Sequence, residues 1–299
     1  MELKNHRLSI IVADPAAIET QRFDRTALIE QVVLDGKYTF CTPEQVLPGR
    51  RTTFGMGLAG EFVLEGAAEQ AKAGELFVKP GVGLMEQLAD KAPYDIWKNY
   101  PLRPLPVIAR QQEDSVVFTQ EPARAGGYGI RIQKTLSLRE NRLVMDIQAE
   151  NIGEKPYTLR EYQHNFLSLE GKPVGPGYEL EIPCDRTLRE ITRKTLRQGD
   201  EIVLPSAVRV EESRVIWEDD LSGKVMYHRS DDIAPDAPHR WTLRHRESGC
   251  SVSEEACFCP SRMDIWAVEH CICTEFYFCA FLSPGERAVW RRVWTFGAQ

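Results

Sequence analysis

The residues of Tyr157–Leu169 are the first whose types and spacing could do chemistry. The stretch reads YTLREYQHNFLSL, and the side chains of a strand alternate between its two faces. Tyr162, His164 and Phe166 therefore share one face, while Gln163 lies on the other. An imidazole between aromatic rings suits the wall of a sugar site, since His titrates near neutrality. The alternative is a half-buried histidine that only hydrogen-bonds across strands, and this stretch alone favours that alternative.

A second candidate is Glu275, which lies in the stretch Cys271–Phe281 (CICTEFYFCAF). Both faces of this predicted strand are apolar, so Glu275 is a carboxylate among uncharged neighbours. Burying a carboxylate is costly unless it is paired, hydrogen-bonded or protonated. A carboxyl group with a shifted pKa suits general acid/base catalysis. The alternative is a structural ion pair with an arginine, but the apolar neighbours favour a functional role.

Two C-x-C pairs, Cys257-Phe258-Cys259 and Cys271-Ile272-Cys273, raise the question of a zinc site. Structural zinc sites usually space their ligands C-x(2–4)-C at a turn, which differs from C-x-C inside a strand. Cys is also a common small core residue. We therefore expect these cysteines in the core and expect no metal.

Cations near tight turns are the remaining candidates. The Gly-rich stretch Pro48–Phe62 contains Arg50 and Arg51, and Lys79 precedes the turn Pro80-Gly81. A guanidinium fork suits sugar hydroxyls or a phosphate group, although the glycines follow neither the dinucleotide-binding pattern nor the P-loop pattern. Solvated loop arginines are the alternative.

Short alternating runs between turn residues fill most of the chain and would position these side chains. The clearest is a hairpin in which Gly129–Leu138 and Leu143–Ala149 flank a turn at Asn141-Arg142. Many short strands between Gly and Pro turns indicate an all-β sandwich or barrel. Only two segments, Glu44–Gly49 and Gly66–Ala73, are predicted as short helices. With no repeat and no linker, we expect one domain over residues 1–299.

Composition narrows the classes of function. The 299 residues carry a net charge of -7 and a pI of about 5.5, which argues against a nucleic-acid partner. We find no signal peptide and no apolar run long enough to span a membrane, so we expect no membrane partner. Eight cysteines without an export signal are expected as reduced thiols in a cytoplasmic protein.

The order of these motifs resembles that of the aldose 1-epimerase (galactose mutarotase-like) superfamily. In that family a hairpin precedes an N-H-S-Y-F-N-L-x-G motif, then come a Glu on a late strand, a Pro-Gly-Glu loop and a last strand. Here His164–Gly171 reads HNFLSLEG, Glu275 stands on a late strand, and Ser283-Pro284-Gly285-Glu286 follows it. The resemblance covers the chain from about Tyr128 to its end.

The resemblance implies a large antiparallel β-supersandwich that interconverts the anomers of a sugar by ring opening. His164 would be the general acid that protonates the ring oxygen, and Glu275 the general base that takes the anomeric hydroxyl proton. The family needs no metal or other cofactor, so the expected partner is a small-molecule carbohydrate. By position, the sugar contacts would be Arg51, Lys79, Gln163 and Asp232.

Departures from the family pattern leave alternatives open. Gln163 stands where the family commonly has Asn, Lys79 lies roughly where it has a second His, and Asp232 matches its sugar-binding Asp by position alone. The chain is therefore an epimerase, a non-catalytic carbohydrate-binding protein of the same fold, or a sugar-phosphate epimerase. The sequence leaves open which sugar is bound and the oligomeric state, a homodimer included.

Overall fold

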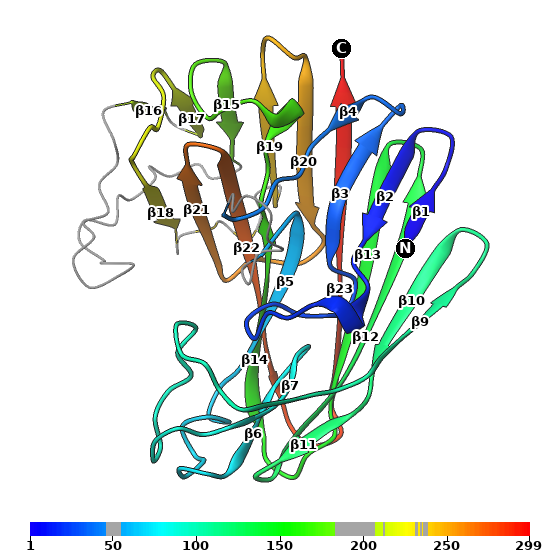
Figure 1. The fold of residues 1–299 in the computed structure, drawn as a ribbon, viewed down its shortest axis with the longest axis vertical. Coiled ribbons are helices and arrows are strands. Elements are labelled where there is room, and N and C mark those ends of the chain that lie inside the picture. Colours follow the sequence, from blue (N-terminus) through cyan, green and yellow to red (C-terminus); the bar gives the residue numbers. More distant parts are fainter. Residues whose placement is uncertain (46–54, 183–206, 212, 231–232, 234, 236–238) are drawn as a thin grey trace.

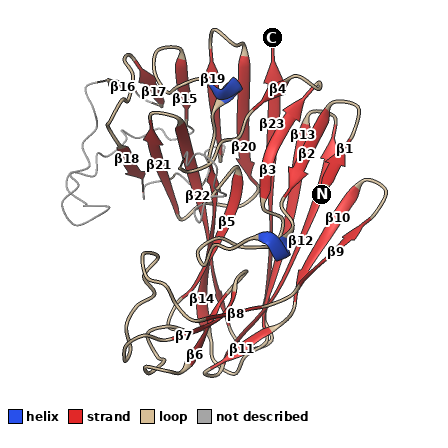
Figure 2. Cartoon of the chain, in the orientation of Figure 1, coloured by secondary structure: helices blue, strands red, loops and turns tan. Residues whose placement is uncertain are grey.

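A computed structural model describes residues 1–45, 55–182, 207–211, 213–230, 233, 235 and 239–299. Figure 1 and Figure 2 show that strands dominate this part of the chain. Every strand pair in it is antiparallel, in two large sheets and one small one. The expected all-β class and antiparallel architecture are confirmed.

The first large sheet has the strand order β1-β2-β3-β5-β14-β22-β21-β18, with β4 paired to β3. Its strands are β1 (Glu2–Lys4), β2 (Leu8–Val12), β3 (Ile29–Leu34), β4 (Tyr38–Thr39), β5 (Leu58–Leu64), β14 (Tyr157–Asn165), β18 (Met226–Ser230), β21 (Arg262–Val268) and β22 (Cys271–Leu282). Both stretches singled out for chemistry, β14 and β22, are thus neighbours at the centre of one sheet.

The second large sheet has the order β16-β17-β15-β19-β20-β23-β13-β12-β10-β9, with β11 paired to β12. Its strands are β9 (Val107–Gln111), β10 (Ser115–Gln120), β11 (Ala123–Ala125), β12 (Tyr128–Arg139), β13 (Arg142–Asn151), β15 (Tyr178–Glu181), β16 (Val208–Glu211), β17 (Arg214–Trp217), β19 (Arg240–His245), β20 (Cys250–Ala256) and β23 (Arg287–Ala298). The predicted hairpin is confirmed as β12 and β13, which pair from Arg139↔Arg142 onward.

The small third sheet consists of β6 (Leu76–Lys79), β7 (Gly83–Glu86) and β8 (Leu102–Pro104).

Helix is confined, in the described ranges, to two single 3-10 turns, η1 (Pro15–Ala17) and η2 (Leu169–Gly171). The helix predicted at Gly66–Ala73 is wrong, because the segment forms successive hydrogen-bonded turns after β5. Glu44–Gly49 lies mostly outside the described residues. No helix among the described residues is long and apolar enough to cross a membrane.

The two large sheets share one core, and β14 shows how they meet. The indole of Trp294 on β23 donates to Asn165 Oδ1 at 2.8 Å, and the guanidinium of Arg292 lies 2.7 Å from Glu161 Oε2. Glu161 and Asn165 are odd-numbered positions of β14, so that face points toward the second sheet. The even positions, which include His164, therefore face away from the core.

Candidate active site

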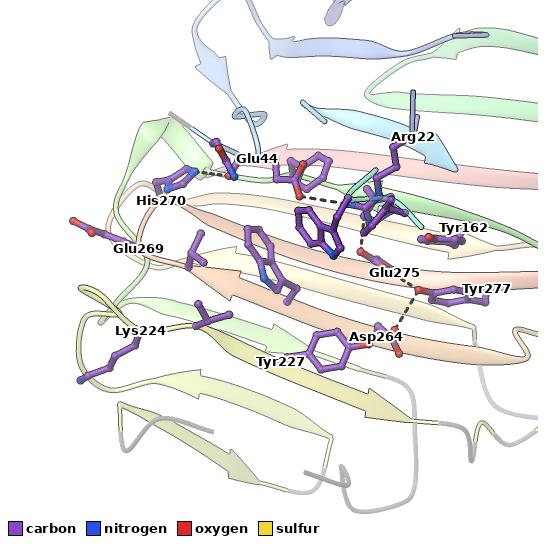
Figure 3. A pocket seen from close by; sticks show the side chains of 18 of the residues that line it. Arg22, Glu44, Tyr162, Lys224, Tyr227, Asp264, Glu269, His270, Glu275 and Tyr277 are labelled. Carbon is purple, nitrogen blue, oxygen red and sulfur yellow. Dashed lines mark hydrogen bonds and ion pairs between the residues drawn. The ribbon is translucent and has the colours of Figure 1, made fainter. Parts of the chain in front are cut away.

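A cavity of about 600 Å³ opens on the face of the first sheet that points away from the second (Figure 3). Side chains from β14, β18, β21 and β22 form its floor and walls, and loop residues form its rim. Its lining consists of Arg22, Glu44, Gln45, Ile96, Trp97, Tyr162, His164, Phe166, Gly223, Lys224, Val225, Tyr227, Arg262, Asp264, Trp266, Val268, Glu269, His270, Glu275 and Tyr277. Both predicted catalytic residues are among them.

His164 and Glu275 are in direct contact at the base of this cavity. The pairing of Tyr162 with Tyr277 and the bridge between Leu167 and Ile272 set a register that places His164 opposite Glu275. The imidazole Nδ1 lies 2.6 Å from Glu275 Oε1. The two residues therefore form a hydrogen-bonded pair that can reach the same small ligand.

The other imidazole nitrogen of His164 faces a second carboxylate. Nε2 lies 3.3 Å from Oε2 of Glu61 on β5, and Glu61 also accepts from Arg22 Nε at 2.7 Å. Burial and the charge of Arg22, whose Nη2 lies 3.4 Å from Nε2, would lower the pKa of His164, but the charge of Glu275 and the hydrogen bonds to both carboxylates raise it above its ordinary value. An imidazole with a carboxylate at each nitrogen favours the doubly protonated form.

Glu275 is held as a carboxylate by the groups around it. Its Oε1 accepts from the Cys273 thiol at 3.3 Å as well as from His164, and its Oε2 accepts from the Tyr277 hydroxyl at 2.9 Å. Burial would raise the pKa of Glu275, but the charge and hydrogen bond of His164 outweigh it and lower that pKa. Both shifts favour an imidazolium beside a carboxylate, a pair that can give one proton and take another.

Aromatic rings surround the pair. His164 lies parallel to Phe166, with ring centroids 5.4 Å apart, and contacts Tyr162 and Phe23 at 4.8 and 5.0 Å. Trp266 on β21 packs edge-on against Phe166 at 6.4 Å. Apolar ring faces beside a few directed polar groups are typical of small-ligand sites.

A third carboxylate, Asp264 on β21, completes the polar wall. Asp264 is the cross-strand partner of Glu275, and it accepts from Tyr227 at 2.7 Å and from Arg262 at 2.5 Å.

Asp264 was not predicted, although Arg262, Asp264 and Trp266 alternate along one strand face. Glu61 in the apolar strand LAGEFVL carries the same signal that identified Glu275. Arg22 lies in a loop and had no sequence signal.

The predicted sugar contacts among the described residues, unlike the predicted catalytic pair, do not lie in the cavity lining. Lys79 is buried on β6, where its Nζ lies 3.2 Å from Glu61 Oε1 and donates to the Phe62 carbonyl at 2.8 Å; it does not line the cavity. Gln163 is buried on the core face of β14, one residue from His164 and therefore on the opposite side of the sheet. Neither residue lines this cavity, and a role for either in sugar binding stays a prediction. Arg51 and Asp232 lie outside the described residues.

His164, Cys273 and Glu275 place one possible metal-ligand atom each within 4.8 Å of one another. In this arrangement a hydrogen bond joins the imidazole and the carboxylate directly. The 2.6 Å between Nδ1 and Oε1 is shorter than the roughly 3.3 Å that tetrahedral ligands about 2.0 Å from zinc would keep. Burial also raises the pKa of the Cys273 thiol well above its ordinary value. Of the other cysteines, Cys271 is buried as expected, whereas Cys257 and Cys259 are exposed.

Comparison with solved structures shows which fold this chain has. A putative aldose 1-epimerase from Escherichia coli K12 superposes with a TM-score of 0.64 at 13% identity, covering 100% of this chain and 98% of that one. The fold is galactose mutarotase-like. A galactose mutarotase related enzyme from Lactobacillus acidophilus gives a TM-score of 0.62 at 12% identity, with coverage of 100% and 97%. A GalM/aldose epimerase homologue from C. elegans gives 0.57 at 13% identity, with coverage of 100% and 98%.

Sequence comparison adds nothing to this galactose mutarotase-like assignment. No protein-family model matches the chain, and no curated protein matches it. Structural likeness at such low identity shows the fold alone, and one fold hosts many functions. The function must therefore be argued from the cavity and from the His164–Glu275 pair.

Proposed function

We propose that this galactose mutarotase-like protein is an aldose 1-epimerase that interconverts the anomers of a sugar. The observation that carries the proposal is the 2.6 Å contact between His164 Nδ1 and Glu275 Oε1 at the base of an aromatic-lined cavity. An acid and a base with opposed pKa shifts, both within reach of one ring, match the needs of ring opening at an anomeric carbon.

The proposed reaction conserves every proton. Glu275 takes the proton of the anomeric hydroxyl while His164 gives a proton to the ring oxygen, so the bond between that oxygen and the anomeric carbon breaks and a carbonyl forms. Rotation about the adjacent carbon–carbon bond turns the carbonyl over. The hydroxyl formed from the ring oxygen then attacks the other face of the carbonyl carbon and gives its proton back to His164. Glu275 returns its proton to the carbonyl oxygen, which becomes the new anomeric hydroxyl.

The direct test is the rate at which freshly dissolved α-aldoses reach anomeric equilibrium. We expect the wild-type protein to accelerate equilibration of at least one aldose over the buffer rate, followed by polarimetry or by NMR of the anomeric protons. The matched protein control is Glu113→Gln, an acid-to-amide change at an exposed position outside the cavity lining. Failure to accelerate any aldose in a broad panel would reject the enzymatic proposal.

The alternative function is carbohydrate binding without turnover. One observation favours it: His164 and Glu275 are already occupied by each other and by Glu61, Cys273 and Tyr277. Sugar binding would have to displace some of these contacts before catalysis. Measurable binding of an aldose by calorimetry, together with an unchanged equilibration rate, is the result that would establish this second function.

The cavity also favours a neutral sugar over a phosphorylated one. Among the described lining residues, the guanidinium of Arg22 is paired with Glu61 and Glu44, and that of Arg262 with Asp264. A phosphate would have to compete with these carboxylates and bring a like charge near them, which costs binding energy. We therefore expect kcat/KM to be at least about tenfold higher for an aldose than for its 6-phosphate. The reverse preference would implicate the exposed lining residue Lys224 or cations outside the described residues, Arg51 among them.

The pH dependence of the rate follows from the pKa shifts of His164 and Glu275. The acid must be an imidazolium, which exists below the pKa of His164, and that pKa is raised. The base must be a carboxylate, which exists above the pKa of Glu275, and that pKa is lowered. We expect a broad plateau in kcat/KM whose alkaline limb lies above the ordinary pKa of imidazole and whose acid limb lies below that of a free glutamate. An alkaline limb at or below the ordinary imidazole value would contradict the assignment of His164 as the acid.

A further inference from the structure

The hydroxyl of Tyr277 lies between two carboxylates on neighbouring strands. It is 2.9 Å from Glu275 Oε2 and 3.2 Å from Asp264 Oδ2, and Figure 3 shows both contacts as dashed lines. Asp264 on β21 and Glu275 on β22 are cross-strand partners, so their side chains leave the sheet on the same face. Tyr277 comes two residues after Glu275 and therefore shares that face.

A tyrosine hydroxyl has one proton to donate, and the two carboxylates differ in how many other hydrogen bonds they accept. Asp264 also accepts from Tyr227 at 2.7 Å, from Arg262 at 2.5 Å and from Arg229 at 3.3 Å. The Oε2 atom of Glu275 receives its hydrogen bond, among the described residues, from Tyr277. The hydroxyl proton therefore points to Glu275, because the distance to Glu275 Oε2 is the shorter one and because Asp264 already accepts hydrogen bonds from three other side chains.

The ring of Tyr277 is fixed even though its hydroxyl can rotate. Its ring stacks on Tyr162, with centroids 4.3 Å apart and planes at 15°, and the guanidinium carbon of Arg262 lies 3.9 Å from its centroid on the ring face. Rotation about the C–O bond alone thus redirects the proton from one carboxylate to the other. No side chain has to move.

We propose that Tyr277 is a positioning residue for Glu275. The Tyr277 hydroxyl donates to the Glu275 carboxylate at rest, and it turns to donate to Asp264 when Glu275 has taken a proton. In the second state the Tyr277 oxygen is free to accept the carboxyl proton of Glu275. The chain Asp264–Tyr277–Glu275 therefore stabilises both protonation states of the base. This inference rests on the proposed function only in giving Glu275 a proton to take from a sugar.

The charged and titratable groups that face Glu275 come from every strand packed around it. They are His164 and Tyr162 on β14, Cys273 and Tyr277 on β22, Asp264 and Arg262 on β21, Tyr227 on β18, Glu61 on β5, and Arg22 from the loop before β3. His164 is the strongest of these partners, so the test must vary Tyr277 and Asp264 while His164 stays in place.

The experiment measures the Glu275 pKa directly by NMR titration of protein labelled with carbon-13 at its glutamate carboxyls, with Glu275→Gln identifying the signal. Tyr277→Phe removes the donor from the resting carboxylate, so we expect that pKa to rise by about one unit. Asp264→Asn removes a nearby negative charge and the charged acceptor for the turned hydroxyl, so we expect the pKa to fall. Tyr38→Phe, the same loss of a hydroxyl at a tyrosine on β4 outside the cavity lining, is expected to leave it unchanged.

Shifts in opposite directions distinguish positioning from a general loss of packing, which would not reverse sign between the two variants. An unchanged Glu275 pKa in Tyr277→Phe, or an increase in Asp264→Asn, would overturn the inference. If the protein turns over a sugar, the acid limb of kcat/KM should move with the titration in each variant. If it turns over none while the titrations shift as expected, the proposed function fails and the control of Glu275 by Tyr277 stands.

Discussion

Replacing Glu275 by glutamine is expected to lower the kcat of anomer interconversion by about 10²–10⁴-fold, the usual contribution of a positioned acid or base. Glutamine keeps the shape of the side chain and can still accept from Tyr277, but it cannot take the anomeric proton. It also removes the carboxylate charge that raises the pKa of His164, so a smaller fraction of His164 carries the proton that it must donate. Polarimetry at saturating sugar would measure the loss.

Two comparisons make that result specific. Glu275→Gln should bind the sugar with a dissociation constant near that of the wild type, because the substitution removes a proton acceptor and leaves the cavity wall in place. Glu61→Gln, a second buried acid-to-amide change at the far nitrogen of His164, should lower the rate less and move the alkaline limb of the pH profile to lower pH. A Glu275→Gln variant with wild-type kcat would mean that another group is the base.

Alternation along a strand is why the sequence could identify this pair. Both stretches contain the strands that were predicted: β22 (Cys271–Leu282) has nearly the predicted bounds, whereas β14 ends at Asn165, short of the predicted Leu169. Because the side-chain period is two, the face shared by Tyr162, His164 and Phe166 followed from the sequence alone. Glu275 stands out in the same way, because it is a lone carboxylate in a run of apolar residues.

Contacts between distant strands could not be derived in the same way. Arg22, Glu61 and Asp264 come from a loop, β5 and β21, and they meet the pair only because β5 and β21 flank β14 and β22 in one sheet. Strand order depends on pairing between segments that lie far apart in the sequence, which a local pattern of residues does not encode. The same limit explains Lys79: its charge suited a ligand, but the fold places it behind Glu61, where it lowers the carboxyl pKa together with Arg22.

Replacing Arg292 by methionine is expected to destabilise the fold by about 3–5 kcal/mol, the usual cost of removing one partner from a buried ion pair. Arg292 is fully buried between the two large sheets. Its guanidinium lies 2.7 Å from Glu161 Oε2 and 2.5 Å from Glu254 Oε1, so the variant leaves two carboxylates without their cation. Guanidinium chloride unfolding of wild type and variant at neutral pH would measure the difference.

The pH dependence of that loss identifies its cause. Burial already raises the pKa of Glu254 even with Arg292 present, and without the cation that pKa should lie further above its unfolded value. A raised carboxyl pKa costs stability when the group must ionise, so the loss should shrink as pH falls and the folded state takes up protons. The exposed pair Arg131–Glu150 is the control, since Arg131→Ala should cost no more than about 1 kcal/mol. A loss at Arg292 that is independent of pH would point to lost packing in place of two unpaired charges.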